Sequence, residues 1–145
     1  MTSLDQIKVE VTEFESRLEA IRSVRERVFI DEQQIDRDLE WDDRDPLCKH
    51  ALVTIADEPV ATGRIDLQKN GKIGRVAVLA EYRRRGLGRR IMEALENFAN
   101  QQGLEKIWFH AQQSAIPFYL QLGYQTVGDE FMEAEIPHII MEKPV

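Results

Sequence analysis

Three short runs rich in β-branched residues follow one another in the middle of the chain and are separated by turn residues. The first two, residues 50–56 and 60–67, are joined by Asp-Glu-Pro at 57–59, and Asn-Gly at 70–71 precedes the third, residues 73–79. Asn-Gly is typical of a tight hairpin turn because both of its residues readily adopt positive φ. The middle of the chain is therefore predicted to form an antiparallel meander of three strands.

Helical periodicity flanks this meander. Apolar residues recur at helical spacing over residues 14–29, after a short strand at 8–11, and again over 87–102, where Gly103 offers a left-handed helix end. The remaining predicted elements are a strand at 106–111, a short helix at 114–122 with Ser114 as N-cap and Gly123 as C-cap, and strands at 124–128 and 138–143.

This order of elements predicts the fold class. An antiparallel meander that feeds a crossover helix, which returns to a parallel strand, implies an α+β fold built as an α/β sandwich. With 145 residues, 43% of them apolar, the chain is expected to form a single domain over residues 1–145.

The sequence also bears on where the protein is found. The longest apolar run, residues 76–80, is far shorter than the roughly 18 residues of a membrane span, and the single cysteine, Cys48, cannot form an internal disulfide. We therefore expect a cytoplasmic protein without a membrane partner.

Charge is unevenly distributed along the chain. The formal net charge is −7, which argues against a nucleic-acid partner. Residues 31–45 carry eight acids against two arginines, a balance of −6, and are expected to form a loop or a short, poorly packed helix. Residues 72–90 have the opposite balance, +6. Such a chain would suit two ligands of opposite charge.

The basic segment contains Arg-Arg-Arg-Gly-Leu-Gly at residues 83–88, between a predicted strand and a predicted helix. A helix N-terminus presents unpaired N–H groups, and glycines let an anion approach them closely. The segment is not a P-loop, because no Gly-Lys-Ser/Thr follows, and it is not a dinucleotide fingerprint, because Ile91 occupies the third glycine position. Taken alone, it fits a phosphate cradle and a solvated basic helix start equally well.

The context of this segment favours the cradle. Arg83-x-x-Gly86-x-Gly88, soon after Val76-Ala77-Val78, resembles the acyl-CoA loop of the GNAT family of N-acetyltransferases. The resemblance implies a mixed, mostly antiparallel sheet with a splayed central strand and helices on both faces. It also implies acetyl-CoA as co-substrate. The implied contacts are Val76, Ala77 and Val78 with the pantetheine arm, and Arg83, Arg84, Arg85, Gly86, Leu87, Gly88 and Arg89 with the pyrophosphate.

A second block supports the resemblance. Residues 114–124 are similar to a later GNAT motif, Ala-x-x-Phe-Tyr-x-x-x-Gly-Phe/Tyr, which places the hydroxyl of Tyr119 beside the thioester sulfur, and Gln112 stands where many members have a cofactor-binding Asn. The alternative for Tyr119 is a half-buried aromatic ring with its hydroxyl in water. Val28-Phe29 with Glu32-Gln33, and residues 110–112 with 136–138, resemble the ElaA-like branch of the family, which implies no particular acceptor.

The implied reaction is direct transfer of an acetyl group from acetyl-CoA to a primary amine. It needs a base for the ammonium, an oxyanion site and an acid for the leaving thiol. The candidate bases are Glu32 and His138, although an exposed glutamate and a merely hydrogen-bonded histidine are the alternatives. A backbone N–H near Val78 is the candidate oxyanion donor, and Tyr119 is the candidate acid. The acidic segment favours a small cationic acceptor, unless it is only a solvated loop.

Other functions stay open at this stage. A non-catalytic acyl-CoA sensor would use the same loop, and an adaptor for an anionic partner would use the same arginines. Acyl transfer through Cys48 is disfavoured because no base is placed near it, and no metal is expected because the three histidines lack ligand spacing. The expected partner is a small amine or a peptide amine, and a homodimer is left open.

Overall fold

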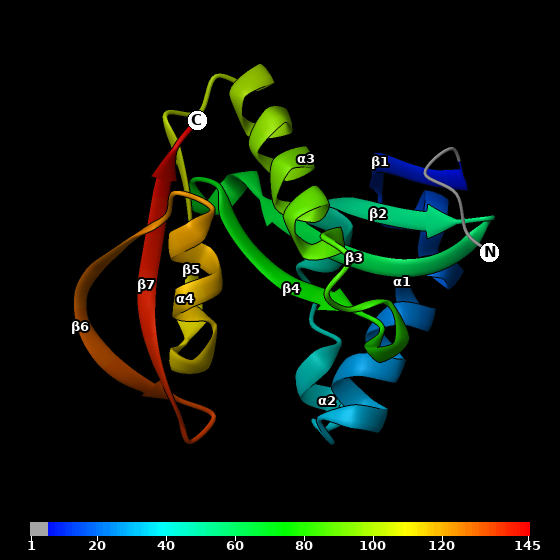
Figure 1. The fold of residues 1–145 in the computed structure, drawn as a ribbon, viewed down its shortest axis with the longest axis horizontal. Coiled ribbons are helices and arrows are strands. Elements are labelled where there is room, and N and C mark those ends of the chain that lie inside the picture. Colours follow the sequence, from blue (N-terminus) through cyan, green and yellow to red (C-terminus); the bar gives the residue numbers. More distant parts are fainter. Residues whose placement is uncertain (1–5) are drawn as a thin grey trace.

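The computed structural model describes residues 6–145, which form one sheet of seven strands (Figure 1). The order across the sheet is β1-β2-β3-β4-β5-β7-β6. The strands are β1 (Ile7–Glu13), β2 (Lys49–Ile55), β3 (Glu58–Asp66), β4 (Lys72–Val78), β5 (Lys106–Gln112), β6 (Gln125–Glu133) and β7 (Ile136–Pro144). The helices are α1 (Leu18–Arg25), α2 (Arg37–Glu40), α3 (Leu87–Gln101) and α4 (Ile116–Gln121). No helix in this described part is both long and apolar enough to cross a bilayer.

The sheet opens at its centre. Every neighbouring pair is antiparallel except β4 and β5, which are parallel and are in register at a single pair, Lys72 and Trp108. A bulge bends β4 after this pair, because Arg75 has a φ of 53° and the register with β3 shifts there. Beyond Lys72 the two strands diverge, which confirms the mixed, mostly antiparallel sheet with a splayed central strand.

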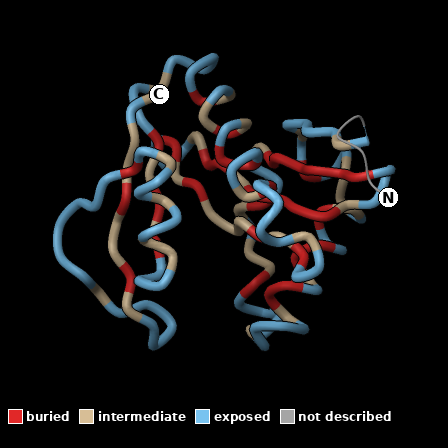
Figure 2. Tube along the Cα trace, viewed as in Figure 1, coloured by how far each residue is buried: buried red, intermediate tan, exposed pale blue. Residues whose placement is uncertain are grey.

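Helices cover both faces of the sheet, as expected. α3 packs closely over β3, where a Cβ on Gly63 would lie 2.8 Å from Ile91 on α3. α4 lies on the same face, because Tyr119 packs against Phe109 of β5 and Phe118 lies against Gly88 of α3. α1 contacts β3 and β4 from the other face. The buried residues concentrate in β2, β3 and α3, whereas β6 is exposed along nearly its whole length (Figure 2).

Three local predictions differ from the structure. The helix expected over 14–29 is a 3₁₀ turn, then α1, and then a π-helical segment, Glu26–Glu32, which extends the helical path to Glu32. The turn between β2 and β3 is formed by Ala56 and Asp57, both with positive φ, and not by residues 57–59. Ser114 is not the N-cap of α4, because a 3₁₀ turn over Gln113–Ala115 precedes the helix and makes Ala115 its first flanking residue.

The acidic segment differs most from its expected form. α2 is short, as predicted, but Glu40 and Asp45 are buried and hold the guanidinium of Arg25, which has no exposed surface, at 2.8 Å each. Arg64 of β3 bonds to both Asp42 and Asp45. The hydrogen bonds from Arg64 hold the pKa of Asp42 well below its ordinary value. The segment is therefore anchored to the sheet by buried ion pairs, and the expectation of a poorly packed or merely solvated segment was wrong for these residues.

Candidate active site

The loop before α3 presents a row of free backbone donors. Within the described residues, the consecutive N–H groups of residues 84–89 have no hydrogen-bond acceptor, and the first helical bond runs from the N–H of Arg90 to the carbonyl of Gly86. Arg84 and Gly86 have φ values of 64° and 77°, which turn successive N–H groups toward one side of the chain. Together with the positive end of the α3 dipole, these groups offer hydrogen-bond donors to an anion.

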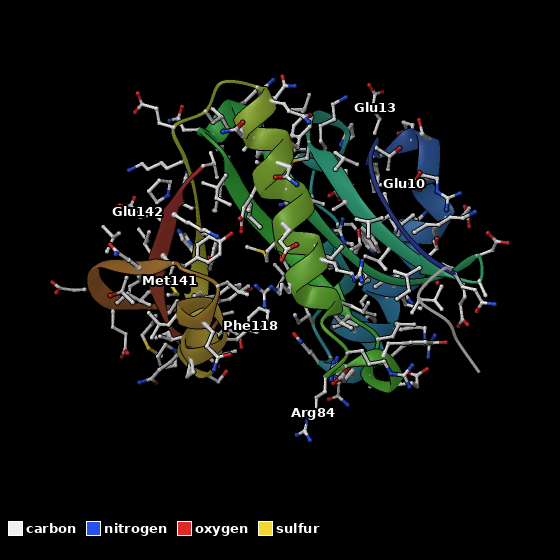
Figure 3. All side chains as sticks on the ribbon, turned by 45° about the horizontal axis from the view of Figure 1, so that its top comes forward. Glu10, Glu13, Arg84, Phe118, Met141 and Glu142 are labelled. Carbon is white, nitrogen blue, oxygen red and sulfur yellow. The ribbon has the colours of Figure 1, made fainter. Side chains whose placement is uncertain are left out.

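The arginines of this loop have different partners. Arg83 donates two hydrogen bonds of 2.6 Å to the carboxylate of Glu32, and its Nε donates to the carbonyl of Val78 at 3.0 Å. Arg89 pairs with Glu93 at 2.9 Å. The Arg84 side chain extends away from the ribbon (Figure 3) and has no ion pair among the described residues. Arg83 therefore ties the loop to the first helical segment, and Arg84 is the freer cation for a phosphate.

The remaining predicted cofactor residues lie on β4 and at the start of α3. Val76 and Val78 are half-buried on the α3 face, whereas the side chain of Ala77 is buried on the opposite face. Leu87 is buried in the core below the loop. A Cβ on Gly88 would lie 3.3 Å from the ring of Phe118 on α4, so glycine at this position lets Phe118 pack closely against the start of α3.

Tyr119 lies on α4, packed between Phe109 and Tyr124 at ring-centroid distances of 4.4 and 5.8 Å. Burial raises the pKa of its phenol to about 12. Its hydroxyl has no hydrogen-bond partner among the described residues, whereas the hydroxyl of Tyr124 donates to Glu96 at 2.6 Å. Tyr119 therefore keeps its proton at neutral pH and has it available for a ligand.

The two candidate bases are placed differently. Glu32 is exposed, and its hydrogen bonds with Arg83 lower its pKa, which makes it a weaker proton acceptor. His138 is buried on β7, beside Gln112 of β5, and its Nδ1 lies 2.7 Å from the carbonyl oxygen of Ile136. The structure thus brings Gln112 and His138 together and keeps Glu32 with the loop.

Sequence reasoning missed the surroundings of His138. Glu133 of β6 and His110 of β5 lie next to it on the same face of the sheet. The available signal was strand alternation, since His110 and Gln112 are two residues apart on β5 and therefore share a face. The partner strand β6 was predicted to end at residue 128, five residues before Glu133, so the contact could not be found.

The opposite charges of the two segments partly neutralise each other. Arg75 from the basic segment contacts Glu40 and Asp42, each at 3.3 Å, and Arg83 is paired with Glu32. Burial raises the pKa of the Cys48 thiol to about 11, so it is not a ready nucleophile. The charge separation in the sequence therefore overstates the charge left for ligands.

In the described residues, the opening of the sheet between β4 and β5 lies beside the N-terminus of α3, whose first amides lack acceptors. The family model of the acetyltransferase (GNAT) domain matches residues 13–145, and the chain therefore belongs to this family.

Individual relatives agree with this assignment. YyaT of Bacillus subtilis is 38% identical over 135 residues, covering 90% of this chain and 91% of YyaT. The uncharacterized N-acetyltransferase YjcF of the same organism is 35% identical over 139 residues, covering 94% of this chain and 99% of YjcF. The crystal structure of Escherichia coli ElaA superposes with a TM-score of 0.82 at 27% identity, covering 94% of this chain and 99% of ElaA. The chain is therefore an acyltransferase that takes its acyl group from CoA.

Proposed function

We propose that this protein transfers an acetyl group from acetyl-CoA directly to the primary amine of a small cationic acceptor. The observation that carries the proposal is the row of free N–H groups at residues 84–89, next to the opening between β4 and β5. The free amides would bind the pyrophosphate, and the unpaired edge of β4 beyond Lys72 would hold the pantetheine arm. The thioester would then lie in the opening, near Tyr119.

The chain's own groups fill the three chemical roles. The base takes one proton from the ammonium, and the freed nitrogen attacks the thioester carbon. A backbone N–H near Val78 stabilises the carbonyl oxygen as it gains charge. Tyr119 gives its proton to the departing sulfur and regains one from the nitrogen through water, so that one proton stays on the base and passes to solvent. Of the two candidate bases we favour His138, because Glu32 is held by Arg83.

A panel of amines tests the proposed class of acceptor. Polyamines, amino sugars, aminoglycosides and peptide N-termini are incubated with acetyl-CoA, and release of free CoA thiol is measured for each. Several exposed acids remain near the first helices without an ion pair among the described residues, namely Asp31, Asp38 and Asp43. We expect cationic amines to give the highest kcat/KM. A preference for neutral or acidic amines would contradict the proposed acceptor class, and tight binding of acetyl-CoA without thiol release from any amine would favour a sensor.

Gly86→Val tests the loop. At the Gly86 φ of 77°, valine must either strain the backbone or shift it. Either change moves the N–H groups of the loop so that they no longer point toward the same anion. We expect the affinity for acetyl-CoA, measured by calorimetry, to fall at least about tenfold, because each charge-assisted hydrogen bond lost contributes roughly 1.5–3 kcal/mol.

Gly103→Val is the matched control. Gly103 lies at the other end of α3 with a φ of 81°, and a Cβ at either glycine meets no atom within 4 Å. Both variants should therefore lose similar stability, while Gly103→Val keeps its affinity for acetyl-CoA. Equal affinities in two folded variants would remove the loop from the site.

A further inference from the structure

Side chains from three strands meet on the face of the sheet opposite α4. Oε2 of Glu133, at the end of β6, lies 3.2 Å from Nδ1 of His110 on β5 and 3.7 Å from Nε2 of His138 on β7. The side chain of Glu133 is 48% exposed, whereas that of His138 is 9% exposed. The carboxylate therefore stands between two imidazoles and solvent.

The hydrogen bond between His138 and Ile136 leaves two acceptors facing each other. Its Nδ1 lies 2.7 Å from the carbonyl oxygen of Ile136, and because a carbonyl only accepts, Nδ1 carries the proton. In the neutral ring Nε2 then presents a lone pair toward the carboxylate of Glu133, and no described residue donates a hydrogen bond to that nitrogen. An ammonium group has three N–H donors and no acceptor, so it would satisfy both.

Two aromatic rings lie beside the histidines of this cluster. Phe131 of β6 lies edge-on to His110 at 4.9 Å and stacked on His138 at 6.0 Å, and Trp108 lies 5.8 Å from His110. These rings are only partly buried, and β6 itself is exposed (Figure 2). The ammonium of Lys72 lies over the Trp108 ring, 5.4 Å from its centroid. The surface thus offers one anion next to flat apolar groups, which suits a primary amine that carries a flat apolar group.

The cluster lies level with the opening in the sheet. His138 is paired with Gln112, four residues beyond Trp108 on β5, and Val76 is four residues beyond Lys72 on the parallel strand β4. The free amides of the loop and Tyr119 belong to the face covered by α3 and α4, whereas His110 and His138 belong to the other face. An amine held by the cluster would reach the opening from the side opposite the CoA loop.

We propose that Glu133 binds the ammonium of the acceptor and that Nε2 of His138 removes one of its protons, for an acceptor that is a primary amine with a flat apolar group. The inference rests on the proposed acetyl transfer and names its acceptor subsite. His138 becomes an imidazolium as the amine becomes neutral, and the carboxylate of Glu133 stabilises that cation. The proton then passes to solvent while the nitrogen forms the bond to the acetyl carbon.

Nitrogen NMR of protein labelled in its three histidines tests the subsite directly. Phenethylamine is titrated into the full chain, with phenethyl alcohol as the probe of equal shape that lacks the ammonium. We expect the amine alone to shift the imidazole signals of His110 and His138. The signal of His50 serves as internal control, because that ring is buried in the other half of the sheet and contacts the carbonyl of Asp45.

Two variants of β6 distinguish the loss of the Glu133 subsite from a general effect of replacing a carboxylate on this strand. Glu133→Gln is expected to weaken phenethylamine binding about tenfold, because a charge-assisted hydrogen bond is replaced by a neutral one. Glu130→Gln, an exposed carboxylate on the same strand without an ion pair among the described residues, should leave binding unchanged. His138→Gln should lower kcat while the amine affinity, followed through His110, stays nearly the same.

The outcomes distinguish the subsite from the proposed function. Equal shifts with the amine and the alcohol, or unchanged amine affinity in Glu133→Gln, would mean that Glu133 and His138 form only an internal ion pair, and would overturn the subsite. If acetyl transfer to an amine is observed without any histidine shift, the proposed function stands and the subsite fails. Histidine shifts without acetyl transfer would leave the subsite in place and contradict the proposed function.

Discussion

Tyr119→Phe is expected to lower kcat by about 10²- to 10⁴-fold, the range that general-acid help supplies. The phenylalanine ring keeps the packing of Tyr119 against Phe109 at 4.4 Å, so the fold and the affinity for acetyl-CoA should be retained. Because burial raises the pKa of the Tyr119 phenol to about 12, the proton is present throughout the neutral and mildly alkaline range. The loss should therefore appear equally in kcat and kcat/KM at neutral and mildly alkaline pH.

Tyr124→Phe is the control for this experiment. It also removes a phenolic hydroxyl, but this hydroxyl donates a hydrogen bond of 2.6 Å to Glu96 on α3. We expect it to cost about 0.5–1.5 kcal/mol of stability, the usual net contribution of one hydrogen bond, since Glu96 keeps its ion pair with Lys143 at 2.9 Å, and to leave kcat nearly unchanged. Full turnover in Tyr119→Phe would assign the proton to water and reduce Tyr119 to a packing residue.

Arg25→Met is expected to lower the free energy of unfolding by about 3–5 kcal/mol, the usual cost of breaking a buried ion pair from one side. The guanidinium of Arg25 has no exposed surface and binds Glu40 and Asp45 at 2.8 Å each. Methionine fills a similar volume but leaves both carboxylates buried with one partner fewer. The change is measured by urea unfolding of the two proteins under the same conditions.

Arg22→Met on the same helix is the matched control. Arg22 is exposed and lies 5.3 Å from the ring of Trp41 without a carboxylate partner among the described residues. Its replacement should cost less than about 1 kcal/mol. A similarly small loss in Arg25→Met would show that the buried ion pairs do not hold the acidic segment to the sheet.

Local signals in the sequence predicted most of the fold. Runs rich in β-branched residues and Asn70-Gly71 predicted the meander, and the glycines at 86 and 88 predicted a free helix N-terminus, because each signal depends on a few neighbouring residues. The splay was implied only by the family resemblance, since the single pairing of Lys72 with Trp108 joins strands that are distant in the sequence.

The charged contacts could not be predicted in the same way. Arg25 stands on the apolar side of the first helix, yet its partners Glu40 and Asp45 belong to a segment whose path depends on the finished sheet. The pair of Arg83 with Glu32 joins residues 51 positions apart. Net charge along the sequence therefore overstated both ligand surfaces, because part of that charge forms internal ion pairs.

Mass spectrometry of the acceptor, with parallel measurement of free CoA thiol, tests the central claim most directly. Wild-type protein is incubated with acetyl-CoA and phenethylamine, or with the best amine of the panel. We predict that the amine gains one acetyl group for each thiol released, and that Tyr119→Phe slows both by the same factor. Acetyl-CoA that binds at the loop but leaves every amine unmodified and releases no thiol would contradict the account.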